Sequence, residues 1–304
     1  VRGLFRVEED GTVPKQLMSG LAVGAMTLCI AAPASSQTTV LSHRFTSSDG
    51  VELHYLEAGA GPLLVFVPGW TMPAEIWRPQ IEHFAAEYRV VAFDPRGQGR
   101  SEKANHGYYA GRRARDIGEL LEHLDDEPAI LVGWSLGVHE VLEYTLQTGT
   151  DQVSALVLVD HAIAADWSAS PAFKSRYAEV QTNRDEWIRM FVRAIFATPQ
   201  PESYLEAMTD AALATPANAT AIMIGNLILM DTGDLTPAVE ALDKPALFVW
   251  IEGRPDEWTE AVRRHKPDAG IVVIPDAGHA LFVDQPARFN EALENFLRGI
   301  TDQR

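Results

Sequence analysis

The chain has 304 residues and a formal net charge of −17, with 46% hydrophobic and 22% charged residues. These proportions are those of a soluble globular protein that can bury a sizeable core. Residues 1–34 carry three basic and three acidic side chains, so the rest of the chain carries all of the −17. A surface this acidic repels phosphate backbones, which argues against nucleic-acid binding.

The N-terminal segment has features of an export signal. An apolar stretch of small residues, 17–34, ends in Ala32-Pro33-Ala34, which fits an A-x-A cleavage site. We expect cleavage after Ala34 and export to the periplasm or the exterior; the alternatives are an uncleaved N-terminal anchor and a cytoplasmic protein. The stretch is marginal as a membrane span, and none is expected after cleavage. It contains Cys29, the only cysteine, which excludes a disulfide within the chain and a cysteine metal site.

The first half of the remaining chain alternates strands with helices. Residues 40–46 and 51–57 alternate apolar and polar side chains around a Ser-Ser-Asp-Gly turn and predict a β-hairpin. Continuous apolar runs, typical of strands buried on both faces, then alternate with amphipathic helical patterns. The runs cover 63–67, 88–93, 130–133 and 155–160, and the helical patterns cover 74–86 and 109–124. This alternation predicts a mostly parallel, doubly wound sheet.

The alternation stops after Asp160 and resumes near residue 241. The segment 161–240 contains no convincing strand and four helical stretches, at 170–181, 184–197, 202–213 and 217–230. We interpret it as a helical lid inserted after the sixth strand, because it is too long for a loop. Strands follow at 246–251 and 270–274, with helices at 257–265 and 286–297. The predicted division is a leader (1–34), a core in two parts (35–160 and 241–304) and the lid (161–240).

Residues 130–137, Ile-Leu-Val-Gly-Trp-Ser-Leu-Gly, place a serine at the corner between a strand and a helix. Gly133 and Gly137 flank Ser135 in a G-x-S-x-G pattern, and a strained corner needs glycines where strand and helix approach each other. The turn exposes the Ser135 hydroxyl and puts the Leu136 amide at a helix N-terminus, where an oxyanion can bind. For the pentapeptide alone, a serine N-cap ahead of a surface helix is the alternative.

A serine nucleophile needs a base and a third group that holds the base in one tautomer. Catalytic groups of an open parallel sheet lie at the carboxyl ends of its strands. His279 follows the last predicted strand and Asp256 follows the one before it, each in a short loop. The chain order nucleophile, acid, base is then Ser135, Asp256, His279.

Two other acidic residues compete with Asp256 for the third position. Asp160 also ends a strand, and Glu252 is a third candidate. We choose Asp256 for its position and for the Gly-x-x-Asp spacing of residues 253–256.

The motifs together resemble those of lid-bearing serine esterases of the α/β-hydrolase superfamily, such as pimeloyl-[acyl-carrier-protein] methyl ester carboxylesterases and cofactor-free haloperoxidase/perhydrolase-like esterases. The resemblance covers roughly residues 51–298. It rests on Pro68-Gly69-Trp70, Asp94 to Ser101, Gly133 to Gly137, Gly253 to Asp256, and Gly278-His279. It implies an α/β-hydrolase fold, no cofactor, and an oxyanion hole formed by the backbone amides of Trp70 and Leu136.

The chain departs from this pattern at two positions. Pro68 replaces the histidine of the usual His-Gly, which keeps the amide donor but removes an imidazole that often braces the loop. Val138 stands where many relatives have a second glycine. Trp70 and Trp134 flank the serine and are expected to form aromatic walls of a substrate site. No metal-binding or dinucleotide motif is apparent, and no metal site is predicted.

These observations predict a carboxylesterase that acts on small to medium esters. Ser135 attacks the carbonyl, His279 moves the proton and Asp256 orients His279. A lactonase, a perhydrolase or a C–C bond hydrolase would use the same triad, and a peptidase is also possible. A hydrolase-fold binding protein without chemistry is the alternative from another class. Serine at the nucleophile position disfavours haloalkane dehalogenase and epoxide hydrolase chemistry, which use aspartate there.

Overall fold

The computed structural model describes residues 38–125, 128–164, 169–229 and 234–301. The predicted leader and its cleavage site lie outside these ranges. Within them, every helix is too short or too polar to cross a membrane.

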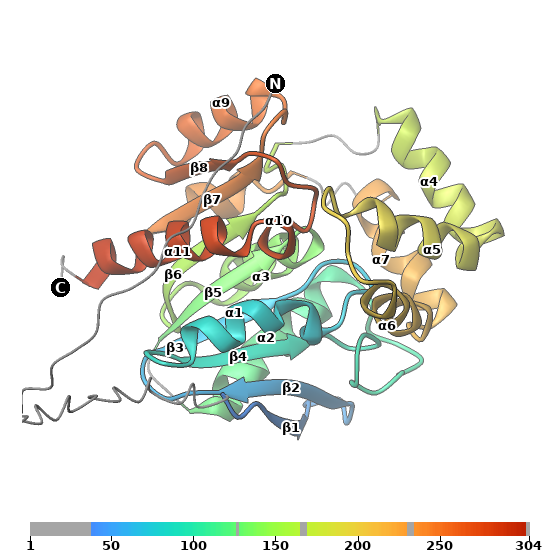
Figure 1. Cartoon of the computed structure of the whole chain (residues 1–304), viewed down its shortest axis with the longest axis horizontal. Helices are drawn as coiled ribbons and strands as arrows, with labels where there is room; N and C mark the ends of the chain where they lie inside the picture. The colour runs from blue at the N-terminus through green and yellow to red at the C-terminus, as the bar shows by residue number, and fades with distance from the viewer. Residues whose placement is uncertain (1–37, 126–127, 165–168, 230–233, 302–304) are drawn as a thin grey trace, which may run out of the picture. The chain divides into compact units, whose positions relative to one another are not determined.

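The core is one sheet of eight strands in the order β1-β2-β4-β3-β5-β6-β7-β8 (Figure 1). β1 and β2 form the predicted hairpin, β2 pairs antiparallel with β4, and all other neighbours are parallel. The strands are β1 (Leu41–Thr46), β2 (Glu52–Ala58), β3 (Leu63–Val67), β4 (Arg89–Asp94), β5 (Ala129–Trp134), β6 (Val153–Val159), β7 (Ala246–Ile251) and β8 (Gly270–Ile274). The predicted α/β fold with a mostly parallel sheet is confirmed.

Helices cover both faces of this sheet because its strands are apolar on both sides. In β3, Leu64 and Phe66 belong to one buried cluster with side chains of α1 and α11, whereas Val65 belongs to a second cluster with side chains of α2, α3 and α9. The helices are α1 (Arg78–Phe84), α2 (Ala110–Leu124), α3 (Leu136–Thr148), α9 (Asp256–His265), α10 (Leu281–Asp284) and α11 (Pro286–Thr301).

One predicted helix is divided in the structure. Residues 74–86 form a 3₁₀ turn, η1 (Ala74–Trp77), followed by α1. Pro79 lies in the first turn of α1, where a missing backbone N–H costs nothing, whereas a proline inside one long helix would break it.

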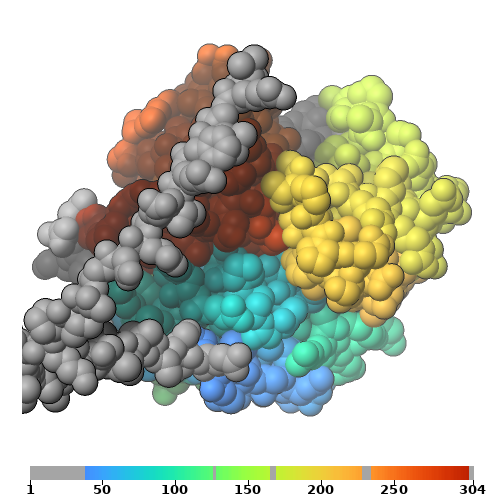
Figure 2. All heavy atoms as spheres, viewed as in Figure 1, coloured from blue at the N-terminus to red at the C-terminus, as the bar shows by residue number. Residues whose placement is uncertain are grey.

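Among the described residues between β6 and β7, five α-helices lie in the segment predicted to be helical. They are α4 (Pro171–Thr182), α5 (Arg184–Ala194), α6 (Glu202–Leu213), α7 (Ala217–Leu229) and α8 (Thr236–Glu240). α8 packs with α3 on the sheet. The other four, which we call the helical insertion, gather beyond the carboxyl ends of the strands (Figure 1), and Figure 2 shows α4, α5 and α6 as one continuous group of yellow atoms.

Candidate active site

Ser135 lies at a strained corner between β5 and α3. Its φ of 54° and ψ of −119° fall outside the regions that side-chain-bearing residues usually adopt. A Cβ on Gly133 would lie 2.5 Å from the Gly137 carbonyl oxygen, and a Cβ on Gly137 would lie 2.5 Å from that of Val67. The two glycines therefore let strand and helix pass at a distance that no other residue allows, as the pattern predicted.

Three side chains from three strand ends form a continuous hydrogen-bonded series. His279 Nε2 lies 2.8 Å from Ser135 Oγ, and His279 Nδ1 lies 2.6 Å from Asp160 Oδ2. A carboxylate can only accept, so Nδ1 carries the proton and Nε2 is free to accept from the serine hydroxyl. Asp160 is wholly buried, whereas the His279 side chain is 23% exposed. The arrangement is that of a nucleophile, a base and a group that orients the base.

The prediction that Asp256 is the partner of His279 is wrong in this structure. Asp256 opens α9 and is exposed, where a carboxylate in the first turn stabilises the helix dipole. Asp160 directly follows β6, the neighbour of β5 in the sheet, and its backbone N–H bonds to the Val249 carbonyl of β7. The sheet itself thus places Asp160 one strand away from the serine. Asp160 is the alternative acid that the sequence also offers at a strand end.

Arg254 lies beside Asp160 and pairs with its carboxylate. Its Nε lies 2.8 Å from Asp160 Oδ1, and its second nitrogen pairs with Oδ2. Burial raises the pKa of Asp160, but the hydrogen bonds from Arg254 and His279 outweigh it and hold that pKa at about 2. Asp160 is therefore a charged group at neutral pH although it is buried.

The loop after β3 lies against Ser135 despite Pro68. A Cβ on Gly69 would come within 3.0 Å of the Ser135 Cβ, which places the Trp70 backbone beside the nucleophile. Leu136 opens α3, so its N–H has no acceptor within the helix. These two amides stay the predicted oxyanion donors.

A glutamine braces this loop, and no local pattern in the sequence indicates its role. Gln98 Nε2 donates to the carbonyls of Gly69 at 3.0 Å and Met72 at 2.8 Å, and Gln98 Oε1 accepts from Arg113 at 2.8 Å. Gln98 is fully buried. The brace expected from a histidine before Gly69 is thus replaced by an amide from the loop after β4.

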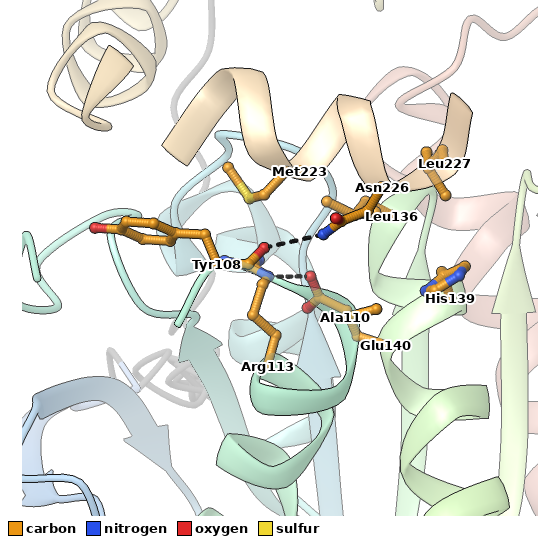
Figure 3. A pocket seen from close by; sticks show the side chains of 9 residues that line it. All are labelled: Tyr108, Ala110, Arg113, Leu136, His139, Glu140, Met223, Asn226 and Leu227. Carbon is orange, nitrogen blue, oxygen red and sulfur yellow. Dashed lines mark hydrogen bonds and ion pairs between the residues drawn. The ribbon is translucent and has the colours of Figure 1, made fainter. Parts of the chain in front are cut away.

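Arg113 extends this brace to the helix that follows the nucleophile. Figure 3 shows its guanidinium beside the Glu140 carboxylate of α3, with which it forms a buried ion pair. The hollow between these residues and α7 has a volume of about 10 Å³, which is too small for more than a water molecule. This interior is therefore a polar support and not a second binding site.

A cavity of about 680 Å³ opens above the serine, between the strand ends and the helical insertion. Ser135, Leu136, His279 and Trp70 form part of its lining. The insertion contributes mainly aromatic and aliphatic side chains: Phe173, Trp187, Phe191, Ala194, Ile195, Ile224 and Leu227. A volume in this range suits a small organic ligand, and the apolar walls suit an acyl or aryl group.

Comparison with known proteins agrees with this geometry. Residues 64–292 match the model of the alpha/beta hydrolase family. The chain belongs to that family. It is 28% identical over 263 residues to a pimeloyl-[acyl-carrier protein] methyl ester esterase of Aliivibrio salmonicida, a match that covers 81% of this chain and 96% of the relative. A non-heme haloperoxidase of Rhodococcus erythropolis is 35% identical over 115 residues, which cover 38% of this chain and 42% of that relative.

The solved structures show the same fold. An esterase of Exiguobacterium antarcticum superposes with a TM-score of 0.77 at 21% identity, covering 85% of this chain and all of that one. The resemblance to α/β-hydrolase esterases inferred from the sequence is therefore confirmed, and the family's fold accounts for the strand-end positions of Ser135 and His279.

Of the two tryptophans predicted to form walls, the structure places one in the cavity of this hydrolase. Trp70 lines the cavity. Trp134 is 1% exposed and packs edge-on against Phe282 in the core, and its Nε1 donates to the His279 carbonyl at 2.8 Å. The prediction of Trp134 as a substrate contact is therefore corrected: the residue supports the backbone of the base.

The loop that carries His279 is fastened to the helical insertion. The Asp284 carboxylate accepts from the backbone N–H of Gly278 at 2.7 Å, of Ala197 at 2.8 Å and of Thr198 at 3.1 Å. The Ala280 N–H donates to the carbonyl of Ile195 at 2.8 Å. The end of α5 and the histidine loop are thus one hydrogen-bonded unit.

Proposed function

We propose that this α/β-hydrolase is a carboxylesterase that cleaves small to medium carboxylic esters through an acyl-enzyme on Ser135. The observation that carries the proposal is the hydrogen-bonded series Ser135, His279, Asp160 at the base of a largely apolar cavity. The activity of the Aliivibrio relative, a methyl ester esterase, supports the same reaction class.

The geometry assigns each group a step. Ser135 Oγ attacks the ester carbonyl while its proton passes to His279 Nε2, 2.8 Å away. The imidazolium that forms is stabilised by the Asp160 carboxylate, and it then protonates the departing alkoxide, which leaves as the alcohol. A water molecule, deprotonated by the same Nε2, attacks the acyl-enzyme, and the proton returns to Ser135 as the carboxylic acid departs.

Backbone amides stabilise the negative charge that develops on the carbonyl oxygen of the substrate. Trp70 and Leu136 are the proposed donors, one beside the serine and the other at the start of α3, where the helix dipole favours a negative charge. Gln98 fixes the carbonyls on both sides of the Trp70 amide, so this donor is held before the substrate arrives.

Replacement of the nucleophile tests the proposal. Ser135→Ala should lower kcat on p-nitrophenyl butyrate by about 10⁴- to 10⁶-fold, because no other group supplies the attacking oxygen. A fluorophosphonate probe should label the unmodified protein and not this variant. Ser175→Ala, at an exposed position of α4, is the matched control and should retain activity and labelling. Undiminished hydrolysis by a folded Ser135→Ala protein would refute the assignment.

A further inference from the structure

An arginine of the helical insertion lines the same cavity as the serine and the histidine. Arg176 belongs to α4, which packs against α5 and α7 (Figure 1). Its guanidinium lies 4.9 Å from the ring centre of Phe173 and 5.6 Å from that of Trp187. Contact with aromatic faces holds the cation in place and leaves its in-plane N–H donors available.

Three other arginines near the site are each paired with a carboxylate. Arg96 pairs with Asp116, Arg113 with Glu140, and Arg254 with Asp160. In the part of the chain that the structure describes, no carboxylate oxygen lies within 4.0 Å of the Arg176 guanidinium. Glu179, one turn further along α4, acts on it only through the longer-range charge interaction. Arg176 therefore differs from these three arginines near the serine.

The charge balance of the cavity points the same way. Among the described residues that line it, Asp160 is the only acidic one, and the Arg254 guanidinium already compensates that carboxylate. Burial lowers the pKa of Arg176, which means that the cation has lost hydration that a bound anion would replace. In a protein of net charge −17, the described lining of the cavity thus carries one positive charge, that of Arg176, with no carboxylate paired to it.

We propose that Arg176 binds a carboxylate at the far end of the acyl chain, so that the substrates are half-esters of aliphatic dicarboxylic acids. This inference rests on the proposed esterase function and names its substrate class. A single guanidinium matches one carboxylate in charge and in bidentate geometry, whereas a phosphate monoester would bring about −1.5 to −2 charges. The apolar walls contributed by Phe173 and Trp187 accommodate the methylene chain between the two ends.

Pairs of esters that differ only in the terminal charge test the proposal. Monomethyl succinate, glutarate and adipate are compared with the uncharged methyl butyrate, valerate and hexanoate. We expect the intact protein to prefer the charged member for at least one chain length. Arg176→Gln should lower kcat/KM for that half-ester by about tenfold or more, mainly through KM, and change the uncharged partner by less than about twofold. Arg176→Lys should fall between, because it keeps the charge without the planar fork.

Lys174 supplies the matched control. It lies on the same helix, is exposed and does not line the cavity, so Lys174→Gln removes the same charge from α4 and should leave the preference intact. Equal losses on charged and uncharged esters in Arg176→Gln, or no preference in the intact protein at any length, would overturn the proposal.

A binding measurement separates this proposal from the proposed function. Calorimetric titration of Ser135→Ala with glutarate and adipate reports the anion site without any turnover. Binding of either dianion that disappears in Ser135→Ala/Arg176→Gln supports the site, even if the serine were shown not to be the nucleophile. Binding that survives the second substitution, or no binding of either acid, contradicts the role of Arg176.

Discussion

The corners after β6 and β7 each provide an aspartate, and the two residues have opposite surroundings. Asp160 directly follows β6, has a φ of 51°, is buried, and receives hydrogen bonds from His279 and Arg254. Asp256 follows β7 after residues 252–255 and lies exposed in the first turn of α9. Asp160 is positioned by the sheet because it stands directly at a strand end, whereas Asp256, several residues after its strand, is positioned by α9.

A pair of matched substitutions tests this comparison most directly. Asp160→Asn should lower kcat about 10³- to 10⁴-fold, because the amide cannot stabilise the imidazolium and presents a donor to Nδ1. Asp256→Asn should leave kcat within about twofold, since its carboxylate is exposed in α9. Ester hydrolysis by both proteins, with circular dichroism to verify folding, gives the answer. The reverse order of effects would restore Asp256 as the acid.

Arg254 distinguishes the two corners further, with a smaller expected effect. Arg254→Gln removes one of the two hydrogen-bond partners that keep the pKa of Asp160 at about 2, so this pKa should rise toward its ordinary value of 3.8. A lowered carboxylate pKa stabilises the folded state above pH 3.8, and this stability is lost as the pH falls toward 2.

The variant should therefore unfold at a higher pH on acidification, and its kcat at pH 7 should fall by about tenfold, the equivalent of ~1.4 kcal/mol. Acid titration followed by tryptophan fluorescence, together with kcat, measures both effects. An unchanged acid midpoint would mean that Arg254 does not support Asp160.

His161, the next residue along the chain, tests the same corner through stability and not through catalysis. Burial, and then the charges of His139 and His279, lower its pKa to about 3, so it stays neutral when folded while the unfolded chain takes up a proton below pH 6.5. Stability should thus fall on acidification, by about 2 kcal/mol between pH 6.5 and pH 5. Urea unfolding at pH 7 and pH 5 should show this loss in the intact protein and a smaller one in His161→Gln. Equal losses in both would argue against a buried neutral His161.

The sequence predicts the fold and two members of the hydrogen-bonded series, Ser135 and His279, because their signals are local. Apolar runs and helical periodicity indicate the sheet, and the glycines beside Ser135 reflect contacts within a single turn. His279 follows a strand by a short loop. The signal for the acidic partner of His279 is not local, because carboxylates follow two adjacent strands, β6 and β7. Which of them bonds to His279 depends on tertiary contacts such as the direction of the Arg254 side chain.

The roles of Gln98 and Trp134, which the sequence analysis does not predict, also have physical reasons. Gln98 acts through bonds to the loop after β3, which no pattern within residues 94–101 reveals. The orientation of Trp134 follows from the alternation of side chains between the two faces of β5. Ile130, Val132 and Trp134 occupy every second position of β5 and share one buried cluster, so the indole had to face the core.

The hydrogen bonds between the histidine loop and the end of α5 constrain how reactants travel. Moving α5 aside would break the bonds at Ile195 and Asp284 that support the base. α7 is tied likewise, since the Trp70 indole N–H donates to the Thr220 carbonyl at 3.1 Å. Substrate and product are therefore expected to move to and from Ser135 along α4. An arriving ester then passes the Arg176 guanidinium before it reaches the serine.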